Sequence, residues 1–268
     1  MGVFQAVVLG ITQGVTEFLP ISSDGHLWIV YRLFGEQPNL AFEVFLHFAT
    51  LLVLVAYFRR DIVRVLGSLS PANRERRVER RLAMLILVGT VVSGAIALFM
   101  GSVVETANSS ALWVGLGFLL TTALMVLAEV SAPHVRRVLQ AGELPVWKAV
   151  PVGILQALAV LPGVSRSGST ISAGMYSGLD RSEAARFSFL LGIPIIALAG
   201  LKDIADIVSG HAALPSLLPA AAGFIAAGAC GYLAIWALLG FVKNHSLYWF
   251  AAYTGVVGTA ILVWTAAR

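Results

Sequence analysis

Long apolar runs separated by short polar stretches dominate the pattern along the chain. A membrane-spanning helix needs about 20 mostly apolar residues, and six runs approach that length. They cover residues 42–58, 82–100, 111–128, 185–201, 214–239 and 247–264. The pattern therefore predicts an all-α membrane protein with six transmembrane helices.

Two further apolar stretches, residues 3–32 and 147–178, are interrupted near their middle by proline, glycine and serine. The interruptions are Pro20 and Gly25 in the first stretch and Pro162, Gly163 and Gly168 in the second. Broken backbone inside a bilayer is tolerated only where protein buries it or where it lines a wet cavity. We interpret both stretches as re-entrant helix hairpins.

The two interrupted stretches resemble each other, since Gly10 aligns with Gly153, Gln13 with Gln156, and Pro20 with Pro162. Each hairpin precedes three spans, so residues 1–130 and 147–268 form two similar units of a single membrane domain. An odd number of spans per unit forces the second copy to insert upside down. Inverted repeats with broken helices typically form their site where the repeats meet.

Composition supports this class, because 58% of the residues are hydrophobic and 12% are charged, against roughly 25% charged in soluble domains. Basic residues cluster on one side of the predicted spans, which places that side in the cytoplasm. This side holds Arg59, Arg60, Arg64, Arg74, Arg76, Arg77, Arg80, Arg81, Arg136, Arg137, Lys148, Arg181, Arg186 and Lys243. The other side holds only Arg32, Lys202 and Arg268. The net charge of +4 is thus explained by membrane orientation, and we expect no nucleic-acid partner.

With this orientation the first hairpin enters from outside and the second from inside, so their tips can meet in the membrane. The first tip carries Gln13 and Glu17, spaced i, i+4 on one helix face. An oxygen pair of this type suits Mg²⁺ or Ca²⁺. Ser22 and Ser23 are candidate ligands or nucleophiles, and His26 can move a proton. The alternative interpretation is structural, with a serine or Asp24 capping the next helix.

The second tip carries Arg166 between Ser165 and Ser167, with Thr170 one turn further on. A guanidinium binds phosphate through two parallel hydrogen bonds, and hydroxyl and turn N–H groups add further donors. This tip is therefore a candidate phosphate site. The alternative is a turn whose arginine pairs with a carboxylate for structural reasons.

The segments EFLPISSDGH and PGVSRSGST resemble the two signature motifs of the undecaprenyl-diphosphate phosphatase family, the bacitracin-resistance type. The resemblance covers essentially the whole chain. It implies removal of the terminal phosphate from the C55 isoprenoid diphosphate, which regenerates the carrier lipid for peptidoglycan and other envelope polymers. It also implies a divalent cation, a place in the bacterial cytoplasmic (inner) membrane and an active site facing the periplasm.

Site roles follow from the same resemblance. Gln13 and Glu17 match the family's metal or catalytic pair, Ser23 its proposed nucleophile or phosphate ligand, and His26 the histidine of that motif. Arg166 matches its essential arginine, with Ser165 and Thr170 as phosphate contacts. We assign no direct role to His47, which precedes Phe48-Ala49-Thr50 instead of the family's Leu-Gly-Thr, or to Asp24. Arg181 and Arg186 also match family positions, but as helix anchors near the cytoplasm.

Other functions stay open on the residues alone. A transporter or flippase for polyprenyl phosphate would also use inverted repeats and an intramembrane anion site, and a non-catalytic scaffold would need neither motif. The expected partners are the polyprenyl diphosphate and membrane lipids, and the chain is compatible with a homodimer.

Overall fold

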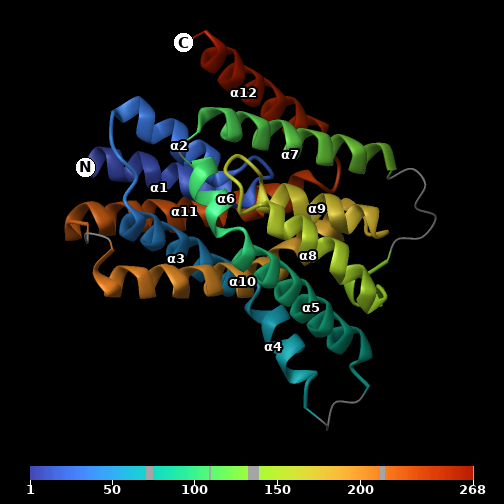
Figure 1. Cartoon of the computed structure of the whole chain (residues 1–268). Coiled ribbons are helices and arrows are strands. Elements are labelled where there is room, and N and C mark those ends of the chain that lie inside the picture. The colour runs from blue at the N-terminus through green and yellow to red at the C-terminus, as the bar shows by residue number, and fades with distance from the viewer. Residues whose placement is uncertain (71–74, 109, 132–138, 212–214, 268) are drawn as a thin grey trace.

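The structure is a computed structural model that describes residues 1–70, 75–108, 110–131, 139–211 and 215–267. Within these ranges the chain is helical and forms no strand, apart from an isolated bridge between Leu139 and Leu179. Figure 1 shows the arrangement of the α-helices. They are α1 (Val3–Phe18), α2 (Ser23–Phe34), α3 (Leu40–Tyr57), α4 (Arg59–Gly67), α5 (Arg77–Phe99), α6 (Gly101–Asn108), α7 (Ala111–Ser131), α8 (Ala149–Leu158), α9 (Arg166–Tyr176), α10 (Arg181–Asp206), α11 (Leu217–Phe241) and α12 (Tyr248–Ala266).

Six helices, α3, α5, α7, α10, α11 and α12, are long and apolar enough to cross a membrane, as predicted. The chain is thus a multi-pass membrane protein. Helix α10 starts four residues before the predicted span because the Asp180 carboxylate caps it, accepting a hydrogen bond from the Glu183 N–H at 2.9 Å. The sequence did not predict the short helices α4 and α6. Residue 214 and the arginines at 74, 136, 137 and 268 lie outside the described residues.

Each interrupted stretch folds as two helices that meet at a polar turn, α1 with α2 and α8 with α9. Serine side chains begin the second helix of each pair. Ser22 Oγ accepts a hydrogen bond from the Gly25 N–H at 3.3 Å, and Ser165 Oγ accepts one from the Gly168 N–H at 3.0 Å. Helix capping, the structural alternative given for the serines of the first tip, is therefore real for Ser22, and Ser165 caps α9 in the same way.

Helices of the two halves pack against each other in a reciprocal pattern (Figure 1). Helix α1 packs on α11 while α8 packs on α5, and α3 packs on α10 while α7 packs on α12. The aligned glycines mark the two close crossings. A Cβ atom on Gly10 would lie 2.3 Å from the Gly223 carbonyl oxygen, and one on Gly153 would lie 2.7 Å from that of Gly89. Each hairpin is thus held by a span of the opposite half.

An aromatic cluster closes the core directly beside the first turn. Phe18, Phe58 and Phe189 are almost fully buried, and the ring of Phe189 lies 5.8 Å from that of Phe18 and 5.9 Å from that of Phe58. Because Phe18 is the last residue of α1, this packing fixes where α1 ends and where the preceding Glu17 side chain emerges.

Candidate active site

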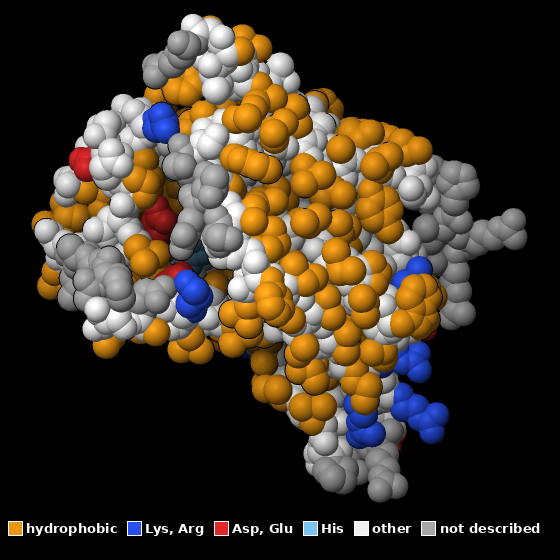
Figure 2. Space-filling model, viewed as in Figure 1, with side chains coloured by type: hydrophobic (Ala, Val, Ile, Leu, Met, Phe, Trp, Pro, Cys, Tyr) orange, Lys and Arg blue, Asp and Glu red, His pale blue; other side chains and the backbone are white. Residues whose placement is uncertain are grey.

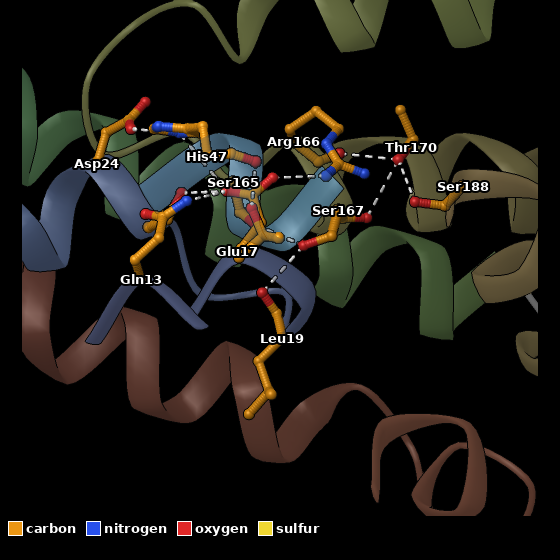
Figure 3. Close-up of polar contacts among 12 residues, drawn as sticks. Gln13, Glu17, Leu19, Asp24, His47, Ser165, Arg166, Ser167, Thr170 and Ser188 are labelled. Atoms are coloured by element: carbon orange, nitrogen blue, oxygen red, sulfur yellow. Dashed lines mark hydrogen bonds and ion pairs between the residues drawn. The ribbon is translucent and has the colours of Figure 1, made fainter. Parts of the chain in front are cut away.

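An ion pair between Glu17 and Arg166 joins the tips of the two helix pairs (Figure 3). Arg166 Nη2 donates to Glu17 Oε1 at 2.7 Å, and the two side chains are 13% and 7% exposed. A second bond crosses between the tips, because Ser167 Oγ donates to the Leu19 carbonyl oxygen at 2.9 Å. The expected meeting of the tips is confirmed, and it occurs by direct contact.

The other oxygen of Glu17 is surrounded by donors of its own tip. Ser23 Oγ donates to Glu17 Oε2 at 2.8 Å, and Gln13 Nε2 donates to the same oxygen at 3.1 Å. The Ser23 hydroxyl hydrogen therefore already points at a carboxylate. This is the geometry that a general base requires to take a proton from a serine.

One nitrogen of the Arg166 guanidinium, Nη1, is buried and has no hydrogen-bond partner within the part of the chain that the structure describes. A buried donor without a partner costs about 1–3 kcal/mol, so the site is more stable when an acceptor arrives. An anionic oxygen such as that of a phosphate is the acceptor that a guanidinium binds best.

The remaining residues of the second tip hold Arg166 in place. The Ser165 N–H donates to Thr121 Oγ1 at 2.9 Å, which ties the turn to α7. Thr170 Oγ1 donates to the Arg166 carbonyl oxygen at 2.8 Å and lies 2.6 Å from Ser188 Oγ on α10. The Ser167 hydroxyl already donates its hydrogen to the Leu19 carbonyl oxygen. Of the predicted phosphate contacts, only Ser165 and Arg166 line the cavity described below.

The first tip contains Ser22, the only non-glycine residue with positive φ in the described ranges, at 71°. His26 holds this strained residue, since its Nδ1 lies 2.6 Å from the Ser22 carbonyl oxygen and must carry the hydrogen of that bond. The other ring nitrogen lies 2.8 Å from the Tyr253 hydroxyl on α12. Both nitrogens are thus engaged, and neither Ser22 nor His26 lines the cavity. Among the described residues the polar contacts of His26 are thus those with Ser22 and Tyr253, and the catalytic role predicted for it stays a prediction.

A cavity of about 420 Å³ opens beside the ion pair, and Figure 2 shows a hollow in this face with acidic side chains on its floor. Glu17, Ser23 and Arg166 line it together. His47, to which the sequence assigned no role, lines it too, with Nε2 3.9 Å from both Glu17 Oε2 and Asp24 Oδ1. Its position four residues after Glu43 in an apolar span was the available signal, because ionisable side chains within spans are usually functional.

The residues predicted to hold a metal lie together but do not form a complete shell. Within the described part of the chain, no three His, Cys, Asp or Glu side chains gather in a metal-binding arrangement. Gln13 is fully buried, however, and its Oε1 has no hydrogen-bond partner there. An orphan oxygen next to the Glu17 carboxylate fits a hard cation that takes its other ligands from water and substrate phosphates, as Mg²⁺ commonly does.

Two arginines that the sequence placed near the cytoplasm, Arg181 and Arg186, serve as anchors between helices, as expected. Arg181 pairs with Glu129 of α7, and that carboxylate also accepts the Leu247 N–H at 2.7 Å. Arg186 pairs with Asp61 of α4. Both ion pairs stabilise contacts between helices and lie outside the cavity.

Comparison with known proteins matches residues 6–260 to the family described as Bacitracin resistance protein BacA. A protein named undecaprenyl-diphosphatase from Methanosphaera stadtmanae is 37% identical over 276 residues, which cover 98% of each chain. Proteins of the same name from Rubrobacter xylanophilus and Desulfosudis oleivorans are each 40% identical, over 93% and 98% of each chain.

Proposed function

The chain belongs to the bacitracin resistance protein BacA family, and we propose that it hydrolyses undecaprenyl diphosphate to undecaprenyl phosphate and inorganic phosphate. The relatives above carry the name of that activity. The observation that carries the proposal is the Glu17–Arg166 pair. It brings a carboxylate and a guanidinium, together with the Ser23 hydroxyl, to one cavity, and a transporter would need only the guanidinium.

Binding rests on Arg166 and on the start of α9. Arg166 Nη1 donates to an oxygen of the terminal phosphate, and the positive end of the α9 dipole faces the same charge. The apolar wall of the cavity includes Trp28, Ile195 and Ile196, which gives the first isoprene units a surface to contact. Most of the rate arises from neutralising charge that develops on the transferring phosphoryl group.

Ser23 is the nucleophile in this mechanism. Its Oγ forms a bond to the terminal phosphorus while the bond from phosphorus to the bridging oxygen breaks, and undecaprenyl phosphate leaves with that electron pair. The hydroxyl proton passes to Glu17 Oε2, 2.8 Å away. Water then attacks the phosphoserine, and Ser23 recovers the proton from Glu17 as it leaves. Direct attack by a water that Glu17 deprotonates is the competing route.

His26 acts through the turn instead of on the substrate. Its bond to the Ser22 carbonyl oxygen holds the positive-φ turn that directs Ser23 toward Glu17. Strained backbone of this kind persists only where surrounding contacts hold it. The bond to Tyr253 attaches the turn to α12.

A divalent cation, Mg²⁺ or Ca²⁺, would be held by Glu17 with the Gln13 amide oxygen. When bound, such an ion neutralises diphosphate charge and orients the phosphate oxygens. Gln13 in place of a second carboxylate lowers the negative charge offered to the ion, so we expect the substrate diphosphate to contribute ligands.

The membrane arrangement proposed is an inverted repeat whose two hairpins are re-entrant. The reciprocal packing of α1 on α11 and of α8 on α5 supports it, as do the matched glycine crossings. The cavity is lined by Glu43 in the first turn of α3 and by Asp203 near the end of α10. Glu43 lies at the opposite end of α3 from the end that Arg59 follows, and Asp203 lies at the opposite end of α10 from Arg181. This arrangement supports a cavity facing the periplasm of a bacterial inner membrane. The homodimer stays a prediction.

The deciding experiment measures phosphate release from C55 diphosphate by purified protein in detergent, where transport cannot occur. Wild-type protein should release phosphate, and Arg166→Ala and Glu17→Gln should not. Adding a chelator to the wild type should stop release, and returning Mg²⁺ or Ca²⁺ should restore it. Binding of the lipid without phosphate release would instead favour the transporter.

A further inference from the structure

Helix α4 and the first turns of α5, here called the arm (residues 59–70 and 75–81), form one end of the molecule. In Figure 1 the arm projects away from the rest of the bundle, and no residue of α4 is buried. The site described above leaves the arm without a role. It nevertheless carries a distinct pattern of side chains.

The arm is amphipathic. Val63 and Leu66 are 69% and 61% exposed, whereas Arg60 and Arg64 are exposed on another side of the helix. At 100° per residue the midpoints of the two pairs lie about 110° apart around the axis. In Figure 2 hydrophobic side chains lie along one side of the projection, over α4, and basic side chains gather on the other side, toward the start of α5. A helix of this kind lies in the plane of a lipid–water interface.

The charge of the arm is strongly positive. Its exposed arginines are Arg59, Arg60, Arg64, Arg76, Arg77 and Arg81. Among its carboxylates, Asp61 already pairs with Arg186 of α10, which also ties the arm to the bundle. The arginines therefore greatly outnumber the acidic groups left to balance them.

Membrane orientation calls for some positive charge here, but the arm carries much more than its counterpart in the second half. The segment Leu201–Asp203, which aligns with Arg59–Asp61, holds one basic residue, Lys202, and the connection that follows α10 through Ile207–His211 contains no Arg or Lys. A basic, amphipathic surface at this one connection has the chemistry that binds phosphate headgroups.

We propose that the arm is a docking surface for anionic phospholipids of the cytoplasmic leaflet. Val63 and Leu66 enter the acyl region, and Arg60, Arg64 and Arg77 contact the phosphate headgroups. The inference does not depend on hydrolysis of undecaprenyl diphosphate, so its test uses no activity measurement.

The test uses full-length protein in phosphatidylcholine nanodiscs with trace spin-labelled phosphatidylglycerol or spin-labelled phosphatidylcholine. The measured quantity is the motionally restricted fraction of each label. Wild type should restrict the anionic label more, and this preference should fall from 0.05 M to 0.5 M salt because exposed charges are screened. Each arginine removed should weaken the preference by about fivefold, so Arg60→Gln/Arg64→Gln should abolish most of it.

Two controls separate this role from membrane orientation alone. Arg60→Lys/Arg64→Lys keeps the charge and should keep most of the preference, and Arg32→Gln on the opposite side should leave it unchanged. Two results with wild type alone would overturn the proposal, even if the glutamine variant failed to fold. One is an equal restricted fraction for both labels, and the other is a preference for the anionic label that does not change with salt concentration. An unchanged preference in a folded glutamine variant would overturn it too.

Discussion

Replacing Gly192 by alanine should misplace Arg166 at little cost to folding. Gly192 lies on α10 against the guanidinium, and a Cβ atom there would stand 2.4 Å from Arg166 Nη1 and 2.9 Å from Cζ. Because carbon contacts are comfortable at 3.5–4.0 Å, the guanidinium must move by roughly 1 Å. The atoms that must move are the end of a flexible side chain, so the helices themselves can stay in place.

A shift of this size in a positioning group costs on the order of 100-fold in rate, equivalent to about 2.7 kcal/mol of transition-state stabilisation. We therefore expect kcat/KM for phosphate release from C55 diphosphate to fall about 100-fold in Gly192→Ala. The melting temperature in the same detergent should stay close to that of wild type. Gly228→Ala is the matched control, since nothing lies within 4 Å of a Cβ added there, and it should behave as wild type.

Wild-type kcat/KM in Gly192→Ala would refute the expected displacement of Arg166, provided that Arg166→Ala is inactive under the same conditions. A large drop in melting temperature would refute it in another way, by showing that the clash falls on the helix packing. Partial recovery in the double variant Gly192→Ala/Arg166→Lys would support it, because a lysine is slimmer at its end than an arginine.

Other expected outcomes address the remaining groups of the site. Ser23→Ala should lose about 10³-fold or more in kcat, and quenched reactions of wild type should contain phosphoserine at position 23; full activity in the variant would exclude this nucleophile. Chelation should stop phosphate release without changing the melting temperature by much, since the ion takes part of its shell from substrate; activity that persists in chelator would remove the metal from the mechanism. His26→Ala should lower the melting temperature, because two hydrogen bonds worth about 1 kcal/mol each are lost, and should leave the shape of the pH–rate profile unchanged. A profile that loses one limb in His26→Ala would show instead that His26 moves a proton.

Much of the fold could be predicted from the sequence because its determinants are local. Spans follow from runs of apolar residues, and the two breaks occur at Pro20 and at Pro162 and Gly163, as predicted. Gly25 and Gly168 were wrongly counted among the interruptions, because they lie inside α2 and α9. Gly10 and Gly153, aligned in the sequence as evidence for a repeat, each lie at a close helix crossing in the structure, which the sequence did not predict. The short helix α4 was not predicted, because its mixed apolar and basic residues form no long apolar run.

The functional site, like the fold, could be predicted from the sequence only in part. Glu17, Ser23 and Arg166 stood out in the sequence, since carboxylate, hydroxyl and guanidinium groups in apolar surroundings are costly without a purpose. Only the tertiary structure decided that Glu17 pairs directly with Arg166, that His26 turns away to Tyr253, and that His47 reaches the cavity. These outcomes depend on how each helix is rotated about its axis. Packing between segments far apart in the chain sets that rotation, and no local pattern of residues records it.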